Sequence, residues 1–399
     1  MIDLRAARSD PDRFRTALAR KGADEAFDEL LSADERWREL VPQVDELRSR
    51  QKLKGKPTPD QVEELKQVKE DLRRLEQELA ESETARDRLA LTLPNLPDAS
   101  VPDGTSEEDA QELRRVGEIP NFDEPREHTE VGRFDMERAA RISGARFGYI
   151  IGDAALVAMA LYRFAFAHLT QAGFTPVIPP VLVREEAMYG TGFFPTDRSN
   201  IYALEADGLF LTGTSEVALA ALHMGEILEE LPLRYTGFST CFRREAGAAG
   251  KDTRGMFRVH QFNKVEMFVF VEPETSWAEH DRMLELEEQF LQALGLPYRV
   301  MNVAAGDLGA SAAKKYDIEA WFPFQERYRE VTSCSNTTDY QARRLGIRYR
   351  VHGGGLETPH TLNGTMVTDR ALLAILENFQ GAVPEVLARY GAPAEIHPS

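Results

Sequence analysis

Two strand-like runs in the second half of the chain bracket a glycine-rich turn and carry charged and aromatic side chains. The first run ends at Phe242-Arg243-Arg244-Glu245, the turn reads AGAAGKDTRGM, and the second run opens at Phe257-Arg258-Val259-His260-Gln261-Phe262. Arginine forks hold phosphate oxygens in a bidentate manner, a flat aromatic ring can stack on adenine, and a carboxylate can accept from its exocyclic amine. The whole pattern predicts a nucleotide cradle, whereas an isolated Arg/Glu pair would indicate only a surface salt bridge.

A second candidate site lies near the C-terminal end of the chain. Leu362-Asn363-Gly364-Thr365 is followed by an amphipathic segment that begins at Asp369-Arg370 and continues to Asn378. An arginine in the first turn of a helix lies near the positive end of the helix dipole, which is a natural site for an anion. Taken alone this pattern is weak, because an arginine at such a position is usually solvated.

Together, these blocks resemble motifs 2 and 3 of class II aminoacyl-tRNA synthetases, and residues 173–180, after an amphipathic helix, resemble motif 1. Within the class the similarity is to seryl-tRNA synthetases. Their signatures are matched in order by Thr214-Ser215-Glu216, His260-Gln261-Phe262-Asn263-Lys264-Val265-Glu266, Tyr316-Asp317-Ile318-Glu319-Ala320-Trp321 and Thr332-Ser333-Cys334-Ser335-Asn336. The resemblance covers essentially the whole chain and implies an antiparallel sheet flanked by helices.

The resemblance also implies which residues would bind serine. Thr214 and Glu216, with Ser215 between them, match the positions that hold the α-ammonium group. Glu266 and Thr365 match the positions that read the serine hydroxyl. A buried acceptor that is left unpaired costs on the order of 1–3 kcal/mol, so an analogue without the hydroxyl is rejected.

The implied ATP site extends over motifs 2 and 3. Arg243 matches the arginine that bridges the substrate carboxylate and the α-phosphate, and with Arg370 it is expected to be catalytic. Glu245 matches the residue that reads adenine, Phe262 matches the ring that stacks on it, and Val259 matches a position with backbone contacts. Arg258 matches a second arginine that binds phosphate, as Arg370 does. The other implied ATP-site residues are Arg244, Glu330, Val331, Thr332 and Ser333. Glu330 and Ser333 match the magnesium-side residues, so Mg²⁺ is expected with ATP, and no zinc is expected. The family often has glycine before the motif 3 arginine, where this chain has Asp369.

The activity that the resemblance implies is that of a serine-tRNA ligase. Serine would attack the α-phosphorus in line, pyrophosphate would leave, and a ribose hydroxyl of the terminal tRNA adenosine would then take the seryl group. The expected acceptor is tRNA(Ser), with tRNA(Sec) as a second candidate. Two alternatives stay open at this stage: a seryl-adenylate-forming paralogue with a non-tRNA acceptor, and a non-catalytic coiled-coil adaptor.

The first hundred residues have the spacing of a coiled coil. Apolar residues recur three or four positions apart, with a break at Asp34, at Phe27, Leu30, Trp37, Val41 and Val44 and again at Leu65, Val68, Leu72, Leu75 and Leu79. Between the two series, Leu53-Lys54-Gly55-Lys56-Pro57-Thr58-Pro59 contains residues that stop a helix. A long dimerisation coiled coil is one interpretation. The central breaker favours an antiparallel hairpin, with a second helix from about Pro59 to Thr92.

Five cations with no acid among them lie at or just before the expected turn of this hairpin. They are Arg48, Arg50, Lys52, Lys54 and Lys56. A solvated helix end would explain them without any ligand. Because the arm of the resembled family lies along the tRNA, we favour contacts with tRNA phosphates.

The remaining chain is expected to form an α+β domain. Long strand-like runs alternate with amphipathic helices, which indicates an antiparallel sheet flanked by helices rather than βαβ units. These runs are Gly208–Leu211, Leu233–Phe238, Phe257–Val271 and Tyr328–Cys334. We therefore predict a helical tRNA-binding arm over residues 1–100, a linker over 101–130 rich in proline, glycine and acids, and a catalytic domain over 131–399.

Composition and net charge exclude some classes of protein. The formal net charge of −18 argues against a general nucleic-acid coat protein, although it leaves room for a local basic patch. The two cysteines cannot form a disulfide framework. No apolar run reaches the roughly 20 residues of a membrane span, and the charged start, MIDLRAARSDPDRFR, leads us to expect a cytoplasmic protein. Motif 1 usually builds a two-fold interface, so we expect a homodimer.

Overall fold

The computed structural model describes residues 1–52, 58–247 and 255–397. The chain divides into two compact units, Met1–Leu96 and Pro97–Ser399. The expected boundaries at residues 100 and 130 stay predictions. Among the described residues, we find no helix with the length and apolar character needed to cross a bilayer.

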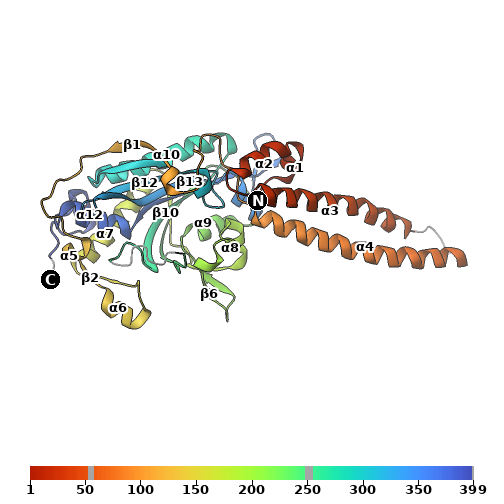
Figure 1. Cartoon of the computed structure of the whole chain (residues 1–399), viewed down its shortest axis with the longest axis horizontal. Helices are drawn as coiled ribbons and strands as arrows, with labels where there is room; N and C mark the ends of the chain where they lie inside the picture. The colour runs from red at the N-terminus through yellow and green to blue at the C-terminus, as the bar shows by residue number, and fades with distance from the viewer. Residues whose placement is uncertain (53–57, 248–254, 398–399) are drawn as a thin grey trace. The chain divides into compact units, whose positions relative to one another are not determined.

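The regular elements in the described part of the first unit are all helices. Short helices α1 (Leu4–Ser9) and α2 (Pro11–Ala19) precede the long helices α3 (Asp24–Arg50) and α4 (Pro59–Thr92). The long helices run antiparallel beside each other (Figure 1). The ion pairs between them agree with this direction, because later residues of α3 pair with earlier residues of α4. These pairs are Arg36 with Glu78, Arg48 with Glu76 and Arg50 with Glu64. The expected coiled-coil arm is therefore confirmed as an intrachain hairpin. The predicted tRNA contacts Lys54 and Lys56 lie outside the described residues.

Asp34, which breaks the apolar spacing, is buried in this unit with 1% of its surface exposed. Both of its carboxylate oxygens accept hydrogen bonds from Arg8 Nη1 at 3.0 Å, and Oδ2 also accepts from Arg38 Nε at 3.0 Å. A buried carboxylate requires such paired donors. The break in the pattern therefore marks an ionic attachment of α1 to α3.

The second unit is built on an eight-stranded sheet with the order β1-β11-β12-β13-β16-β10-β9-β4. Neighbouring strands are antiparallel except for β4 and β9, which are parallel. The strands are β1 (Gln111–Val116), β4 (Thr175–Val177), β9 (Leu233–Phe242), β10 (Gln261–Val271), β11 (Tyr298–Asn302), β12 (Lys314–Phe322), β13 (Arg327–Asn336) and β16 (His360–Thr368). This sheet with its flanking helices (Figure 1) confirms the expected fold class.

Smaller elements surround this sheet. In the part of the chain that the structure describes, short strands form three further sheets: β2 (Arg133–Asp135) with β3 (Tyr149–Ile151); β5 (Leu182–Arg184), β7 (Leu209–Leu211) and β6 (Tyr202–Leu204); and β15 (Leu356–Glu357), β14 (Arg348–Arg350) and β8 (Ile227–Leu228). The α-helices are α5 (His128–Val131), α6 (Met136–Ser143), α7 (Asp153–Gln171), α8 (Glu185–Thr191), α9 (Glu216–Ala220), α10 (Ser276–Ala293), α11 (Tyr340–Arg344) and α12 (Asp369–Phe379). Short 3₁₀ segments occur at Glu107–Asp109, Arg198–Asn200, Ala221–His223, Pro273–Thr275, Ala305–Asp307 and Glu385–Tyr390.

The alternation of side chains along β10 separates the core from the site. Val265, Met267 and Val269 point to one face and pack with buried residues of α7, α10 and α12 in the main hydrophobic core. Lys264 and Glu266 point to the opposite face. The three helices thus cover one side of the sheet, and polar side chains collect on the other.

Two β-bulges adjust the sheet beside these polar side chains. Met366 is an extra residue in β16 opposite the step from Val265 to Glu266, so that Glu266 pairs with Thr365. Val331 is an extra residue in β13 opposite the step from Ile318 to Glu319. A bulge re-aims neighbouring side chains, and each of these two lies next to predicted site residues.

The predicted strands are present but their ends differ from expectation: β7 begins one residue later, β9 extends four residues further, to Phe242, and β13 extends beyond both predicted ends. β10 begins at Gln261, so the predicted strand Phe257–Val271 is four residues too long at its start. Residues 255–260 form irregular backbone. Within the predicted linker, Gln111–Val116 forms β1 and pairs with β11 at the edge of the sheet.

Candidate active site

A cavity of about 340 Å³ lies on the polar face of the sheet. Its walls contain predicted residues from widely separated parts of the sequence. They are Thr214, Glu216, Arg243, Glu245, Arg258, Val259, Phe262, Glu266, Glu330, Val331, Thr332, Ser333, Thr365 and Arg370. The fold thus brings most of the predicted serine and ATP residues into one place.

Two predicted residues do not line this cavity. Arg244 is exposed, and its backbone N–H donates to the Asn200 carbonyl at 2.8 Å. Ser215 is buried, and its hydroxyl donates to the carbonyl of Gly237 at 3.4 Å. Alternating neighbours such as Arg243 and Arg244 point to opposite sides of an extended chain, which explains why only one of the two arginines faces the cavity.

At one end of the cavity Glu216 is held by two amide groups. Its Oε1 accepts from Gln341 Nε2 at 2.8 Å and from Asn363 Nδ2 at 3.0 Å. Burial, and next the negative charge of Glu266, raise the pKa of Glu216 to about 7. A fixed carboxylate in a buried setting is a suitable partner for an ammonium group.

Glu266 lies in the same end of the cavity and pairs with a lysine. Lys264 Nζ is 2.5 Å from Glu266 Oε2 and donates to Thr365 Oγ1 at 3.4 Å. Thr332 Oγ1 donates to the Thr365 carbonyl, which fixes the backbone at that residue. Burial raises the pKa of Glu266, and the charge of Lys264 opposes that rise.

The motif 2 residues form another wall of the cavity. The Arg243 guanidinium lies over the Phe262 ring, 5.2 Å from its centroid, and Arg243 Nε donates to the Gly213 carbonyl at 3.3 Å. Glu245 Oε2 accepts from Arg258 Nη1 at 2.5 Å. Each arginine is thus held beside an acceptor or an aromatic ring on the lining of the cavity.

Arg370 and Glu330 complete this wall. Arg370 Nη1 donates to both the carbonyl oxygen and Oε2 of Glu330, at 3.0 Å each, and its guanidinium lies 4.6 Å from the Phe257 centroid. Lys315 Nζ lies 2.7 Å from Asp317 Oδ1 and 3.8 Å from Glu330 Oε1. Although partial burial disfavours its charged form, Lys315 and then Arg370 lower the pKa of Glu330 to about 2. Glu330 is therefore an anion next to two cations.

Comparison with known proteins decides what this site belongs to. Residues 1–97 match the model of the seryl-tRNA synthetase N-terminal domain, and residues 202–379 match that of the tRNA synthetase class II core domain (G, H, P, S and T). Serine-tRNA ligase 1 of Streptomyces avermitilis is 50% identical, with 99% of each chain covered, and the serine-tRNA ligase of Acidothermus cellulolyticus is 49% identical, with 98% of each chain covered. The chain belongs to the seryl-tRNA synthetase family.

A solved structure agrees with this assignment. The seryl-tRNA synthetase from Pyrococcus horikoshii complexed with ATP superposes with a TM-score of 0.93 at 38% identity, and the match covers 100% of both chains. The predicted serine-tRNA ligase and ATP-dependent ligase activity is thereby confirmed at the level of the family. The non-tRNA paralogue and the coiled-coil adaptor receive no support from these comparisons.

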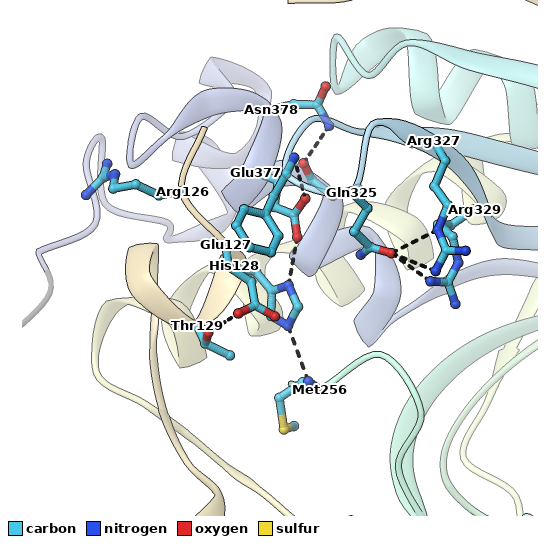
Figure 2. A network of polar contacts seen from close by, with 12 residues as sticks. Arg126, Glu127, His128, Thr129, Met256, Gln325, Arg327, Arg329, Glu377 and Asn378 are labelled. Carbon is cyan, nitrogen blue, oxygen red and sulfur yellow. Dashed lines mark hydrogen bonds and ion pairs between the residues drawn. The ribbon is translucent and has the colours of Figure 1, made fainter. Parts of the chain in front are cut away.

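Figure 2 shows how this member of the seryl-tRNA synthetase family holds the chain that leads into Phe257 and Arg258. His128 Nδ1 lies 2.8 Å from Glu377 Oε1, and the Met256 N–H donates to His128 Nε2 at 3.2 Å. Because Nε2 accepts, the ring proton is on Nδ1 and is donated to Glu377. His128 and Glu377 are buried, with 2% and 0% of their surfaces exposed.

Sequence reasoning missed several polar residues of the site, among them Lys264, Lys315, Gln341 and Asn363. A period of two along β10 places Lys264 on the same face as Glu266, so local alternation was a usable signal for this lysine. Gln341 comes from the short helix α11. Its contact with Glu216 spans 125 residues of sequence and has no local signal.

Proposed function

We propose that this chain activates L-serine with ATP to give seryl-adenylate and transfers the seryl group to the 3′ end of tRNA(Ser), with tRNA(Sec) as a further candidate acceptor. The observation that carries the proposal is the shared cavity. Glu216, Glu266 and Thr365 line one end, and Arg243 and Arg370 line the wall beyond them. A pocket for a small amino acid therefore adjoins a surface for a triphosphate.

Each end of the cavity has a separate task in the proposed reaction. Thr214 and Glu216 bind the serine ammonium, while Glu266 and Thr365 receive the hydroxyl. Arg243 orients the serine carboxylate towards the α-phosphorus. Such positioning, together with fixed positive charge where negative charge develops, accelerates an in-line displacement without a protein nucleophile.

The nucleotide is assigned to the motif 2 and motif 3 residues. Glu245, Val259 and Phe262 are proposed to bind adenine. Arg258 and Arg370 are proposed to bind the β- and γ-phosphates, next to Val331, Thr332 and Ser333. Binding of ATP would then separate the ion pairs Glu245–Arg258 and Glu330–Arg370, because the phosphates compete for the same guanidinium donors.

Glu330 and Ser333 fit a role in holding Mg²⁺. Glu330 is an anion, and the hydroxyl of Ser333 lines the same wall. Mg²⁺ in nucleotide sites is usually held by one or two protein oxygens together with phosphates and water. When bound, the ion would neutralise charge on the phosphate oxygens.

The arm supplies the proposed contact with the tRNA. Arg48, Arg50 and Lys52 are on or just after the end of α3, beside the turn. Arg48 and Arg50 pair with acids of α4, but about half of each side chain is exposed, at 53% and 50%. Exposed arginines can exchange such weak surface pairs for phosphate contacts.

Dimerisation and location complete the proposal. The outward face of α7 exposes Leu156 and Met159, with 52% and 56% of their surfaces accessible, and Ile178 after β4 is 86% exposed. Apolar side chains in such a position are suited to a self-complementary interface, so we propose a homodimer. Because tRNA charging serves protein synthesis, the proposal places the chain in the cytoplasm.

Charging of purified tRNA(Ser) with labelled serine tests the function, with threonine, alanine and cysteine as competitors and ATP–pyrophosphate exchange measured in parallel. We expect serine to be activated and transferred, and R243A to lose about 100- to 1000-fold in activation. R244A is the matched control and should lose far less, because Arg244 lies outside the cavity. Exchange without charging would contradict the tRNA step, and preferential charging of another amino acid would contradict the substrate.

A further inference from the structure

Lys264 lies between the two side chains that are proposed to read the serine hydroxyl. Its side chain is buried, with 5% of the residue exposed, and it lines the cavity from β10. Nζ is 2.5 Å from Glu266 Oε2 and 3.4 Å from Thr365 Oγ1. One ammonium group therefore contacts both proposed readers.

The surroundings of Glu266 make this ammonium necessary. Glu216 of α9 and Glu287 of α10 are buried carboxyl groups close enough to act electrostatically on Glu266. Burial raises the pKa of Glu266, whereas the charges of Lys264 and Arg243 lower it. The Cys241 thiol is a further titratable neighbour, and burial raises its pKa as well. Without Lys264, a desolvated carboxylate among other acids would lose its nearest cation.

The contact also fixes the direction of the hydrogen bonds. Glu266 held as a carboxylate can only accept. Thr365 Oγ1 accepts from Lys264, so the hydroxyl hydrogen of Thr365 is free to point into the cavity. The pair then offers one acceptor and one donor, which is the complement of an alcohol oxygen with its hydrogen.

We infer that Lys264 is a specificity-determining residue, which sets Glu266 and Thr365 in the acceptor and donor states that favour a hydroxylated amino acid over its unsubstituted analogue. This inference rests on the proposed function and deepens it. It distinguishes Lys264 from a lysine that only stabilises the fold, since a purely structural role would leave amino-acid preference and its pH dependence unchanged.

The test compares full-length K264M with the wild type in ATP–pyrophosphate exchange, with serine and alanine as substrates. We expect kcat/KM for serine to fall about 10- to 100-fold, mainly through KM for serine, while KM for ATP changes less than about threefold. The preference for serine over alanine should fall by a similar factor. The rise of kcat/KM for serine with pH should move to higher pH, because the charge of Lys264 lowers the pKa of both Glu266 and Glu216 and its loss would let both keep their protons longer.

Three further variants control this experiment. K264R retains the positive charge and should keep most of the preference and the original pH profile. K264Q retains a donor without the charge and serves where K264M is unstable, with a shifted pH profile expected. K314M removes a different lysine, on β12, whose Nζ donates to Ser100 Oγ at 2.8 Å outside the cavity lining, and its serine parameters should match the wild type.

The outcomes separate this inference from the proposed function. A wild-type chain that does not activate serine would refute the proposed function itself. A wild type that activates serine, together with folded K264M or K264Q that keep the serine preference and the pH profile, would overturn the role of Lys264 alone.

Discussion

The Tyr162 hydroxyl of α7 donates a hydrogen bond to Asp369 Oδ1 in the first turn of α12. The second oxygen, Oδ2, accepts from the Asn263 N–H of β10 at 3.0 Å. Asp369 is only 6% exposed. The acid that stands where the family often has glycine therefore ties together three elements beside Arg370. Burial raises the pKa of Asp369 to about 6, although Tyr162 and Asn263 stabilise its charged form.

We predict that D369A destabilises the protein by about 1–3 kcal/mol, because it leaves the buried Tyr162 hydroxyl and the Asn263 N–H without their acceptor. KM for ATP should also rise, since Arg370 follows directly on the same turn. Urea unfolding and exchange kinetics measure the two effects. Y162F removes only one of the two donors and should cost less; a D369A protein as stable as the wild type would contradict this account.

The pKa of Glu216 predicts how serine use depends on pH. Since burial and Glu266 raise this pKa to about 7, the carboxylate that binds the serine ammonium is increasingly protonated below that value. We expect kcat/KM for serine to fall about tenfold for each pH unit below it. Steady-state exchange kinetics at different pH values, at saturating ATP, provide the measurement.

A matched variant checks that Glu216 causes this pH dependence. Gln341 Nε2 donates to Glu216 and lowers its pKa. Q341M removes that donor, so the fall in activity should begin at a higher pH than in the wild type. A profile that is flat between about pH 6 and pH 8 in both proteins would exclude Glu216 as the controlling group.

His128 is predicted to be a major contributor to stability. H128A removes the partner of Glu377 Oε1 and the acceptor for the Met256 N–H, while Glu377 Oε2 keeps the Phe324 N–H. Leaving a buried polar group without its hydrogen-bond partner costs about 1–3 kcal/mol, and urea unfolding should show a loss of at least this size. E377Q keeps a carbonyl acceptor for the His128 N–H and should lose less. Equal and small losses in both variants would show that the network in Figure 2 contributes little.

Neutralising the basic residues at the arm's turn should weaken tRNA binding in a salt-dependent manner. We expect the fivefold glutamine variant of Arg48, Arg50, Lys52, Lys54 and Lys56 to bind more weakly. The slope of log K against log salt should become smaller by up to about 4. Filter binding at several salt concentrations measures this slope. ATP–pyrophosphate exchange without tRNA should be unchanged, and an unaltered salt slope would refute the assignment.

Local sequence determined much of this protein. The a/d spacing and the central Gly/Pro break give two helices that fold back on each other, because burying an apolar stripe and ending a helix both depend on neighbouring residues. The segment Pro59–Thr92 is a helix as predicted. The motif blocks could likewise be recognised in the sequence, because the functional side chains of each block lie close together along the chain.

Tertiary structure alone decided which of those side chains share the cavity and which groups accompany them. Arg243 faces the cavity and Arg244 does not, and the strand that follows their turn begins at Gln261 instead of Phe257. Asp34 breaks the coiled-coil spacing because Arg8 reaches it from another helix. Contacts such as Gln341 with Glu216 and Tyr162 with Asp369 join distant segments, and their energies depend on burial and geometry that no local pattern encodes.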